Sequence, residues 1–165
     1  MATAVVSELL APLEVVEQIA TANDWEIDRG KTDDTVIMFV EGRCSEYEVA
    51  FTWFENTQLL HVACGFDLKV PKNRQKELDK LIKTLNQEQW LGHFDYWEEA
   101  GLVLLRHCIL RAPEEKITTK QVFGVLERVL NTSEDNVSAF RFVVDDKMTA
   151  SAALELNITT TQGTA

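Results

Sequence analysis

The chain has 165 residues, of which 45% are hydrophobic, so it is long and apolar enough for one domain with a sizeable core, and disorder throughout is excluded. Its formal net charge of −11 argues against nucleic-acid binding, because that affinity depends on Lys and Arg side chains that neutralise phosphates. The three cysteines are an odd number without paired spacing, which argues against a disulfide framework.

The chain also lacks the features of exported and membrane proteins. Its first residues, MATAVVSELL, contain no basic segment, and Glu8 interrupts the apolar run, so no signal peptide is expected. No stretch approaches the roughly 18 consecutive apolar residues that span a bilayer. We therefore expect a soluble, cytoplasmic protein without membrane contact.

The first predicted element is a helix over residues 12–23, since Pro12 suits a first helical turn and the apolar residues after it recur at helical spacing. Strands follow at residues 35–41, 45–55 and 59–66. The second of these alternates apolar and polar positions over its length, which is the strongest strand pattern in the chain.

A second helix is predicted from Pro71 to about residue 89, with leucine and isoleucine on one stripe. Two further strands lie within GHFDYWEEAGLVLLRH (92–107), joined by a turn at residues 99–101. Thr118 or Thr119 can cap a third helix. NTSEDN (131–136) should end or bend it, and FRFVV (140–144) either resumes the helix or forms a short strand.

This order, α-β-β-β-(β)-α-β-β-α, predicts an α+β fold: one twisted antiparallel sheet of about five to six strands with helices packed on one face. A single domain is expected over residues 12–157, with residues 1–11 and 158–165 as flexible termini. The sequence has neither GxGxxG nor GxxxxGK[ST], so the usual phosphate-binding loops are absent.

The 92–107 segment is the best candidate for a site. A three-residue turn would place His93 opposite His107, about 5 Å apart, where they could share a divalent metal with His61 or Cys64. The alternative is that these histidines only cover the sheet and bond neighbours such as Asp95. A ligand- or metal-sensing domain centred on His93, Asp95 and His107 is therefore the second hypothesis, although no local ligand spacing supports a resident metal or cofactor.

Enzymatic chemistry is not expected. Strand pleating sends Asp95 and Glu98 to opposite faces, so they cannot form a carboxylate pair in one cleft. Ser45 and Cys44 follow a turn without a nucleophile motif.

Two features favour partner binding instead. Residues 69–83 carry six positive charges against two negative ones, which indicates either a solvated helix face or a strip that docks an acidic partner. Adjacent aromatic residues in the strands must also project to both sheet faces. If the face without helices is exposed, it should bind protein or peptide. The candidate binding residues are Phe54, Trp90, His93, Asp95, Tyr96 and Trp97.

Several segments in order resemble the YbjN-domain family of bacteria, in the branch described as sensory transduction regulators. They are PLEVVEQIATANDW, SEYEVAFTWFENTQLLHVACGFDLKVP, LNQEQWLGHFDYWEEAGLVLLRH and AFRFVV. The resemblance implies a fold similar to type III secretion chaperones, which dimerise and hold extended segments of client proteins. It implies a regulatory or adaptor role, with a possible homodimer, and a partner segment bound on the open sheet face or beside the 72–89 helix.

Overall fold

The fold is one six-stranded sheet with helices on a single side. It is seen in a computed structural model that describes residues 10–162. The elements are α1 (Pro12–Ala22), β1 (Glu26–Arg29), β2 (Thr35–Glu41), β3 (Glu46–Phe54), β4 (Leu59–Phe66), α2 (Gln75–Glu88), β5 (His93–Trp97), β6 (Leu102–Leu110), α3 (Thr119–Val144) and α4 (Ala150–Gln162). The strand order is β1-β2-β3-β4-β6-β5, and every neighbouring pair is antiparallel.

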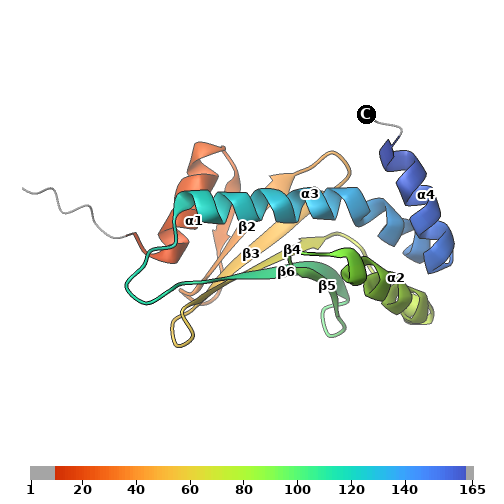
Figure 1. The fold of residues 1–165 in the computed structure, drawn as a ribbon, viewed down its shortest axis with the longest axis horizontal. Helices are drawn as coiled ribbons and strands as arrows, with labels where there is room; N and C mark the ends of the chain where they lie inside the picture. The colour runs from red at the N-terminus through yellow and green to blue at the C-terminus, as the bar shows by residue number, and fades with distance from the viewer. Residues whose placement is uncertain (1–9, 163–165) are drawn as a thin grey trace, which may run out of the picture.

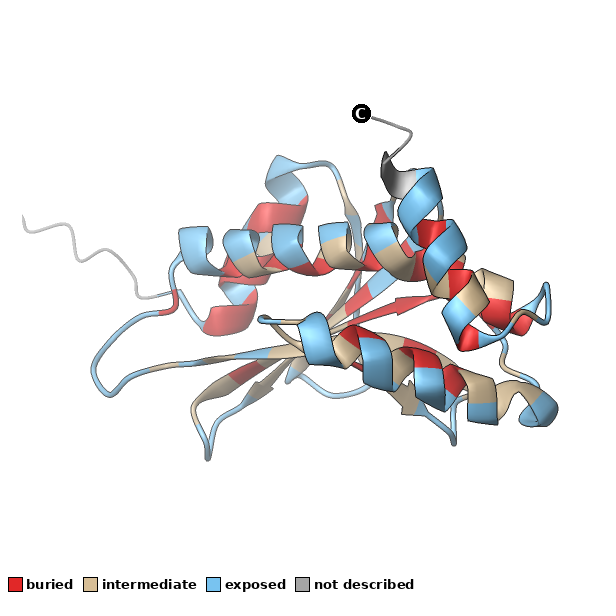
Figure 2. Ribbon diagram, turned by 45° about the vertical axis from the view of Figure 1, so that its right-hand side comes forward, coloured by how far each residue is buried: buried red, intermediate tan, exposed pale blue. Residues whose placement is uncertain are grey.

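The four helices of residues 10–162 lie on one side of the sheet. In Figure 1, α3 runs above the strands between α1 and α4, α2 lies near β5, and only hairpin turns project on the other side. The view in Figure 2 agrees, with the buried residues of the helices turned toward the strands. The core lies in this interface, where Phe140 of α3 packs against Phe66 and Phe94, with ring centroids 5.4 and 5.0 Å apart.

The predicted fold class and element order are confirmed. Strands 35–41 and 59–66 have their predicted ends. The fourth strand before α2 is β1, which precedes these strands and to which no residues had been assigned from the sequence. Of the alternatives at residues 131–136, an end of the helix is wrong, because α3 continues from Thr119 to Val144. FRFVV belongs to this helix, which confirms the alternative that it is helical and not a short strand. In this part α3 packs on the sheet: Val129, Ser133 and Val137 are buried, and the Ser133 hydroxyl donates to Cys64 Sγ at 3.5 Å.

A fourth helix completes the helical layer. α4 includes residues 158–162 of the segment expected to be a flexible terminus, while residues 1–9 and 163–165 lie outside the described part of the chain. Arg74 and Glu77, at the start of α2, hold the junction between α3 and α4. Arg74 donates to the carbonyl of Val143 at 2.8 Å and to that of Met148, and the Glu77 carboxylate accepts from the backbone N–H of Ala150 at 2.9 Å.

Much of the basic segment is therefore ordinary helix surface. Arg74 is half-buried and binds backbone carbonyls at the α3–α4 junction. The five lysines of the segment are exposed to solvent: Lys69, Lys72, Lys76, Lys80 and Lys83.

The turn between β2 and β3 is anchored to α3. Glu134 accepts from the backbone N–H of Cys44 at 3.3 Å and lies 3.5 Å from the Arg43 guanidinium. Arg141, about two turns further along the same helix, donates to the carbonyl of Cys44 at 2.8 Å and to the hydroxyl of Ser45 at 3.3 Å. The ends of β2 and β3 are thereby fixed in position relative to α3.

Candidate functional site

The sheet face opposite the helices is the candidate site, and we call it the open face. Strand pleating places the side chains of alternate residues there. Among the described strand residues, every large hydrophobic side chain that is exposed belongs to this face: Phe39 at 42%, Phe54 at 48%, Trp97 at 53% and Leu110 at 70%. On the helix side the corresponding positions form the core, as Met38, Val49 and Val62 do.

A hollow of about 640 Å³ lies on the open face over the ends of β2, β3, β4 and β6, and we call it the trough. Its floor is built from the small residues Ala50, Ala63 and Gly65, which leave the backbone of β3 and β4 thinly covered. A Cβ at Gly65 would lie 3.2 Å from Leu104 Cδ2, so a larger residue would press on the trough wall. The larger side chains of Phe39 on β2 and Leu104 on β6 flank this floor.

Carboxylates line the trough. None of its lining residues within the described chain is Lys or Arg. Five of them are acidic: Glu26, Glu41, Glu46, Glu48 and Asp67. Glu48 lies in the floor itself, between Phe39 and Gly65 in the strand register, and the other four carboxylates lie nearer the ends of the strands. The hollow therefore combines small and apolar residues with carboxylates.

A polar cluster occupies the middle of the open face. The Arg106 guanidinium donates to Asp95 Oδ2 at 2.8 Å and to His61 Nε2 at 3.1 Å. Burial lowers the pKa of His61 below its ordinary value, and the charges of Arg106 and His93 lower it further. In this arrangement His61 Nε2 is the acceptor of the hydrogen bond from Arg106.

The predicted site residues divide between three places. Phe54, His93, Asp95 and Trp97 lie on the open face, as the strand registers show. Tyr96 points to the helix side, where its hydroxyl accepts from Gln75 at 3.4 Å. The sixth, Trp90, is fully exposed in the segment between α2 and β5.

The predicted pairing of His93 with His107 is wrong. The turn has four residues, Glu98 to Gly101, and Gly101 adopts the left-handed conformation with φ 67°. This one extra residue shifts the register, so His93 faces Arg106. His107 pairs with Val62 on β4 and points to the helix side.

The metal hypothesis loses its geometry with this register. His93 and Asp95 are on one face of the sheet and His107 is on the other. In the described part of the chain, no three His, Cys, Asp or Glu side chains are grouped closely enough to hold a metal ion.

The outer edge of β5 is closed by side chains. Asn86 of α2 accepts from the N–H of Phe94 at 2.7 Å and donates to its carbonyl at 2.9 Å, as a neighbouring strand would. Two residues on, the N–H of Tyr96 donates to the carboxylate of Asp95 at 2.9 Å. An incoming strand would have to displace these bonds, so this edge is a poor site for strand addition.

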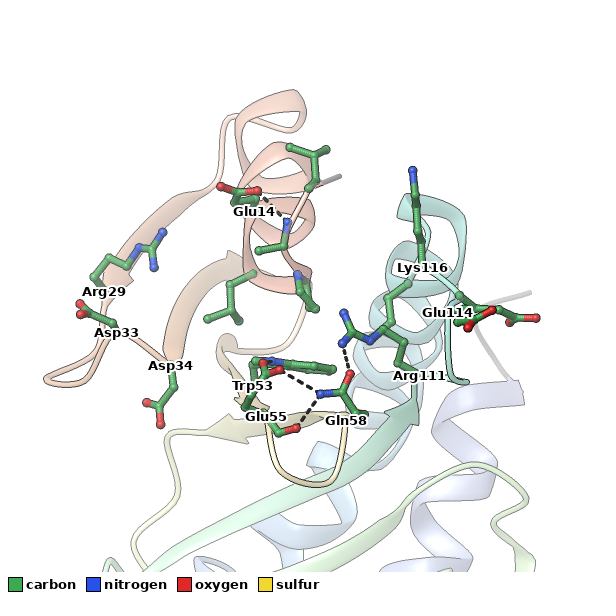
Figure 3. Close-up of a pocket in the computed structure, with 16 residues that line it drawn as sticks. Glu14, Arg29, Asp33, Asp34, Trp53, Glu55, Gln58, Arg111, Glu114 and Lys116 are labelled. Atoms are coloured by element: carbon green, nitrogen blue, oxygen red, sulfur yellow. Dashed lines mark hydrogen bonds between the residues drawn. The ribbon is translucent and has the colours of Figure 1, made fainter. Parts of the chain in front are cut away.

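A second hollow of about 710 Å³ lies between the start of α1, the β3–β4 turn and residues 111–117. Figure 3 shows Arg111 directed toward Trp53 and Gln58, with Arg29, Asp33 and Asp34 on the opposite side. The guanidinium stacks 5.0 Å from the Trp53 ring centroid and donates to the Gln58 amide. These contacts join β6 to the β3–β4 turn.

Glu55 completes that arrangement. It accepts from Trp53 Nε1 at 2.6 Å and from the Gln58 amide at 3.0 Å, and these hydrogen bonds lower the pKa of its carboxyl. Trp53, Gln58 and Arg111 all bind one another or Glu55. We therefore interpret these residues as structural contacts that connect the segment after β6 to the β3–β4 turn, and not as a ligand site.

Sequence reasoning missed several residues of the open face. Phe39 could have been found from the alternation within its strand, because it lies between the core residues Met38 and Val40. Leu110 could have been found in the same way, because it follows Ile109, which packs against the core. Arg106 and the acidic residues of the trough gave no motif, since the sheet register brings them together from separate strands.

A comparison with known protein families matches residues 12–142 to YbjN, described as "Putative bacterial sensory transduction regulator". The chain belongs to the YbjN family. No curated protein and no solved structure shows a significant match. The family description suggests a regulatory role in sensory transduction for this YbjN domain. Among residues 10–162, no helix combines the length and the apolar character needed to cross a membrane.

Proposed function

We propose that this YbjN domain is a non-enzymatic regulatory adaptor of the bacterial cytoplasm that binds a partner polypeptide through its open face. The observation that carries the proposal is the concentration of exposed large hydrophobic side chains on the side of the sheet that no described helix covers. Single exposed apolar residues are ordinary on protein surfaces, but a face that collects them is typical of an interaction surface.

The size of the face suits a polypeptide ligand. β3 crosses it with nine residues, a length of about 27 Å at about 3.4 Å per residue. Along the direction of the strands, Trp97 on β5 lies near one end of the open face and Phe54 on β3 near the other. Burying the exposed halves of these two rings would contribute on the order of 2 kcal/mol or more to binding, which corresponds to at least about tenfold in affinity.

The test is partner capture by the double variant Phe54→Ser/Trp97→Ser. A protein that the wild-type chain captures from its own bacterium, identified by mass spectrometry, should be lost from the double variant. Both positions are exposed, so the variant should still unfold cooperatively in urea, with little change in stability.

The chain offers a matched control. Trp90→Ser/Phe123→Ser removes the same two side-chain types, from the segment before β5 and from the surface of α3. This variant should capture the partner as the wild type does. If the folded open-face variant retains the partner, or if both variants lose it equally, the proposal is wrong.

A further inference from the structure

The chemistry of the partner segment can be read from the trough. We infer that the trough receives an amphipathic helix whose apolar stripe is flanked by Lys or Arg, and this inference rests on the proposed function. Its grounds are the small and apolar residues of the trough, its five carboxylates and the geometry of a sheet face.

The charge of the trough selects a basic ligand. Five carboxylates line it, and none of its described lining residues is cationic. An acidic segment would be repelled there, whereas lysines or arginines beside an apolar stripe would each find a carboxylate. The net charge of −11 on the whole chain adds attraction at longer range.

The geometry favours a helix over an extended strand. In the interior of a sheet the backbone groups are already paired with neighbouring strands, so the face offers side chains and no free backbone partners. An extended segment lying on it would leave its own buried N–H and C=O groups without partners, whereas a helix satisfies them internally. At the β5 edge, Asn86 and Asp95 occupy the backbone groups that strand addition would need.

The width of the trough agrees. Phe39 on β2 and Leu104 on β6 stand on either side of two strands, β3 and β4. Three strand spacings give about 14 Å, and a helix with its side chains is about 10–12 Å across. Ala50, Ala63 and Gly65 lie beneath such a helix and leave room for its apolar stripe. Glu48 stands beside them on β3, where it can meet a lysine or arginine at the edge of that stripe.

A second copy of this chain fits the trough less well. Two open faces packed symmetrically would bring the carboxylates of their troughs together. The lysine-bearing helix α2 could supply charge, but its apolar residues Leu78, Leu81 and Leu85 are already buried in its own core. The trough therefore favours a separate partner.

The experiment uses the full chain and three labelled 18-residue peptides, with binding followed by fluorescence anisotropy at low and moderate salt. The first peptide is an amphipathic helix with a leucine stripe flanked by lysines. The second carries glutamate in place of lysine, and the third carries serine in place of leucine. We expect the first to bind at least about tenfold more tightly than either of the others.

Two glutamine variants distinguish binding in the trough from attraction by the general negative charge of the protein. Glu46→Gln/Glu48→Gln removes two carboxylates from the trough, and Glu114→Gln/Glu115→Gln removes two from the other end of the molecule. We expect the first variant to weaken binding of the basic helix at least about threefold at low salt, with a smaller loss at moderate salt. The second variant should bind nearly as the wild type does.

Other results overturn the inference. Equal loss in both glutamine variants, or equal binding of the serine peptide, would mean that only diffuse charge attracts the ligand. A dimer that dissociates in Glu46→Gln/Glu48→Gln would identify a second copy as the occupant. If Phe54→Ser/Trp97→Ser loses its cellular partner while the peptides are bound without selectivity, the proposed function stands and only this partner chemistry fails.

Discussion

The unfolding free energy of the Asn86→Ala variant tests whether α2 closes the edge of the sheet. The substitution removes two hydrogen bonds to Phe94, with lengths of 2.7 and 2.9 Å. Each contributes about 1 kcal/mol net, while alanine improves the helix by up to about 0.7 kcal/mol. We therefore expect a loss of about 1–2 kcal/mol.

Urea unfolding followed by circular dichroism measures this loss. With a slope of about 2 kcal/mol per molar urea, the midpoint should fall by about 0.5–1 M. Gln87→Ala is the matched control, because Gln87 is the next residue of the same helix and is exposed. Hydrogen exchange at the Phe94 amide should also accelerate in Asn86→Ala. A midpoint equal to that of the control would refute the account of the closed edge.

Three further results are expected. The pKa of His61 is lower in the folded than in the unfolded chain, so as the pH falls the unfolded chain takes up this proton at a higher pH than the folded chain does. The unfolding free energy should therefore fall as the pH drops below about 6.5, and this contribution should level off below the pKa of the folded state. His61→Gln should show a shallower pH dependence in urea unfolding, and an unchanged one would contradict this. Phe140→Ala should lower the unfolding free energy by about 3–5 kcal/mol, because the ring contacts two other core aromatics; a loss below about 1 kcal/mol would argue against that packing. Cys44 and Cys108 are exposed, whereas Cys64 is buried and its burial raises its pKa to about 12, so a thiol reagent should modify two cysteines in the native protein and the third only in denaturant. Three rapid modifications would mean that the core opens.

Most of the fold could be predicted from the sequence because the strands alternate and the first three helices have apolar stripes. β3 is the best example, since Tyr47, Val49 and Phe51 recur at every second residue and are all buried. α4 was missed because its apolar residues do not gather on one side in sequence, and it is held partly by the bonds from Arg74 and Glu77.

The site was harder to predict because it depends on register. One extra residue in the β5–β6 turn exchanged the partner of His93 and separated it from His107. Which of two neighbouring aromatic residues faces the helices also depends on the register. Tyr96 and Trp97 were therefore both predicted as binding residues, although they point to opposite sides of the sheet. Charges that meet only through strand pairing, such as those of Glu26 and Glu48, leave no local pattern.

The strand order has a consequence for how the chain reaches its native state. β1 to β4 form successive hairpins, and β5 and β6 form another, so each of these pairings closes a short loop. Only β4 and β6 pair across the whole of α2 and β5, from Leu59 with Leu110 to Gly65 with Leu104. The pairing of β4 with β6 therefore has the largest loop-closure entropy cost among these strand pairings. Two separately formed parts of the sheet must join there before α3 can cover both.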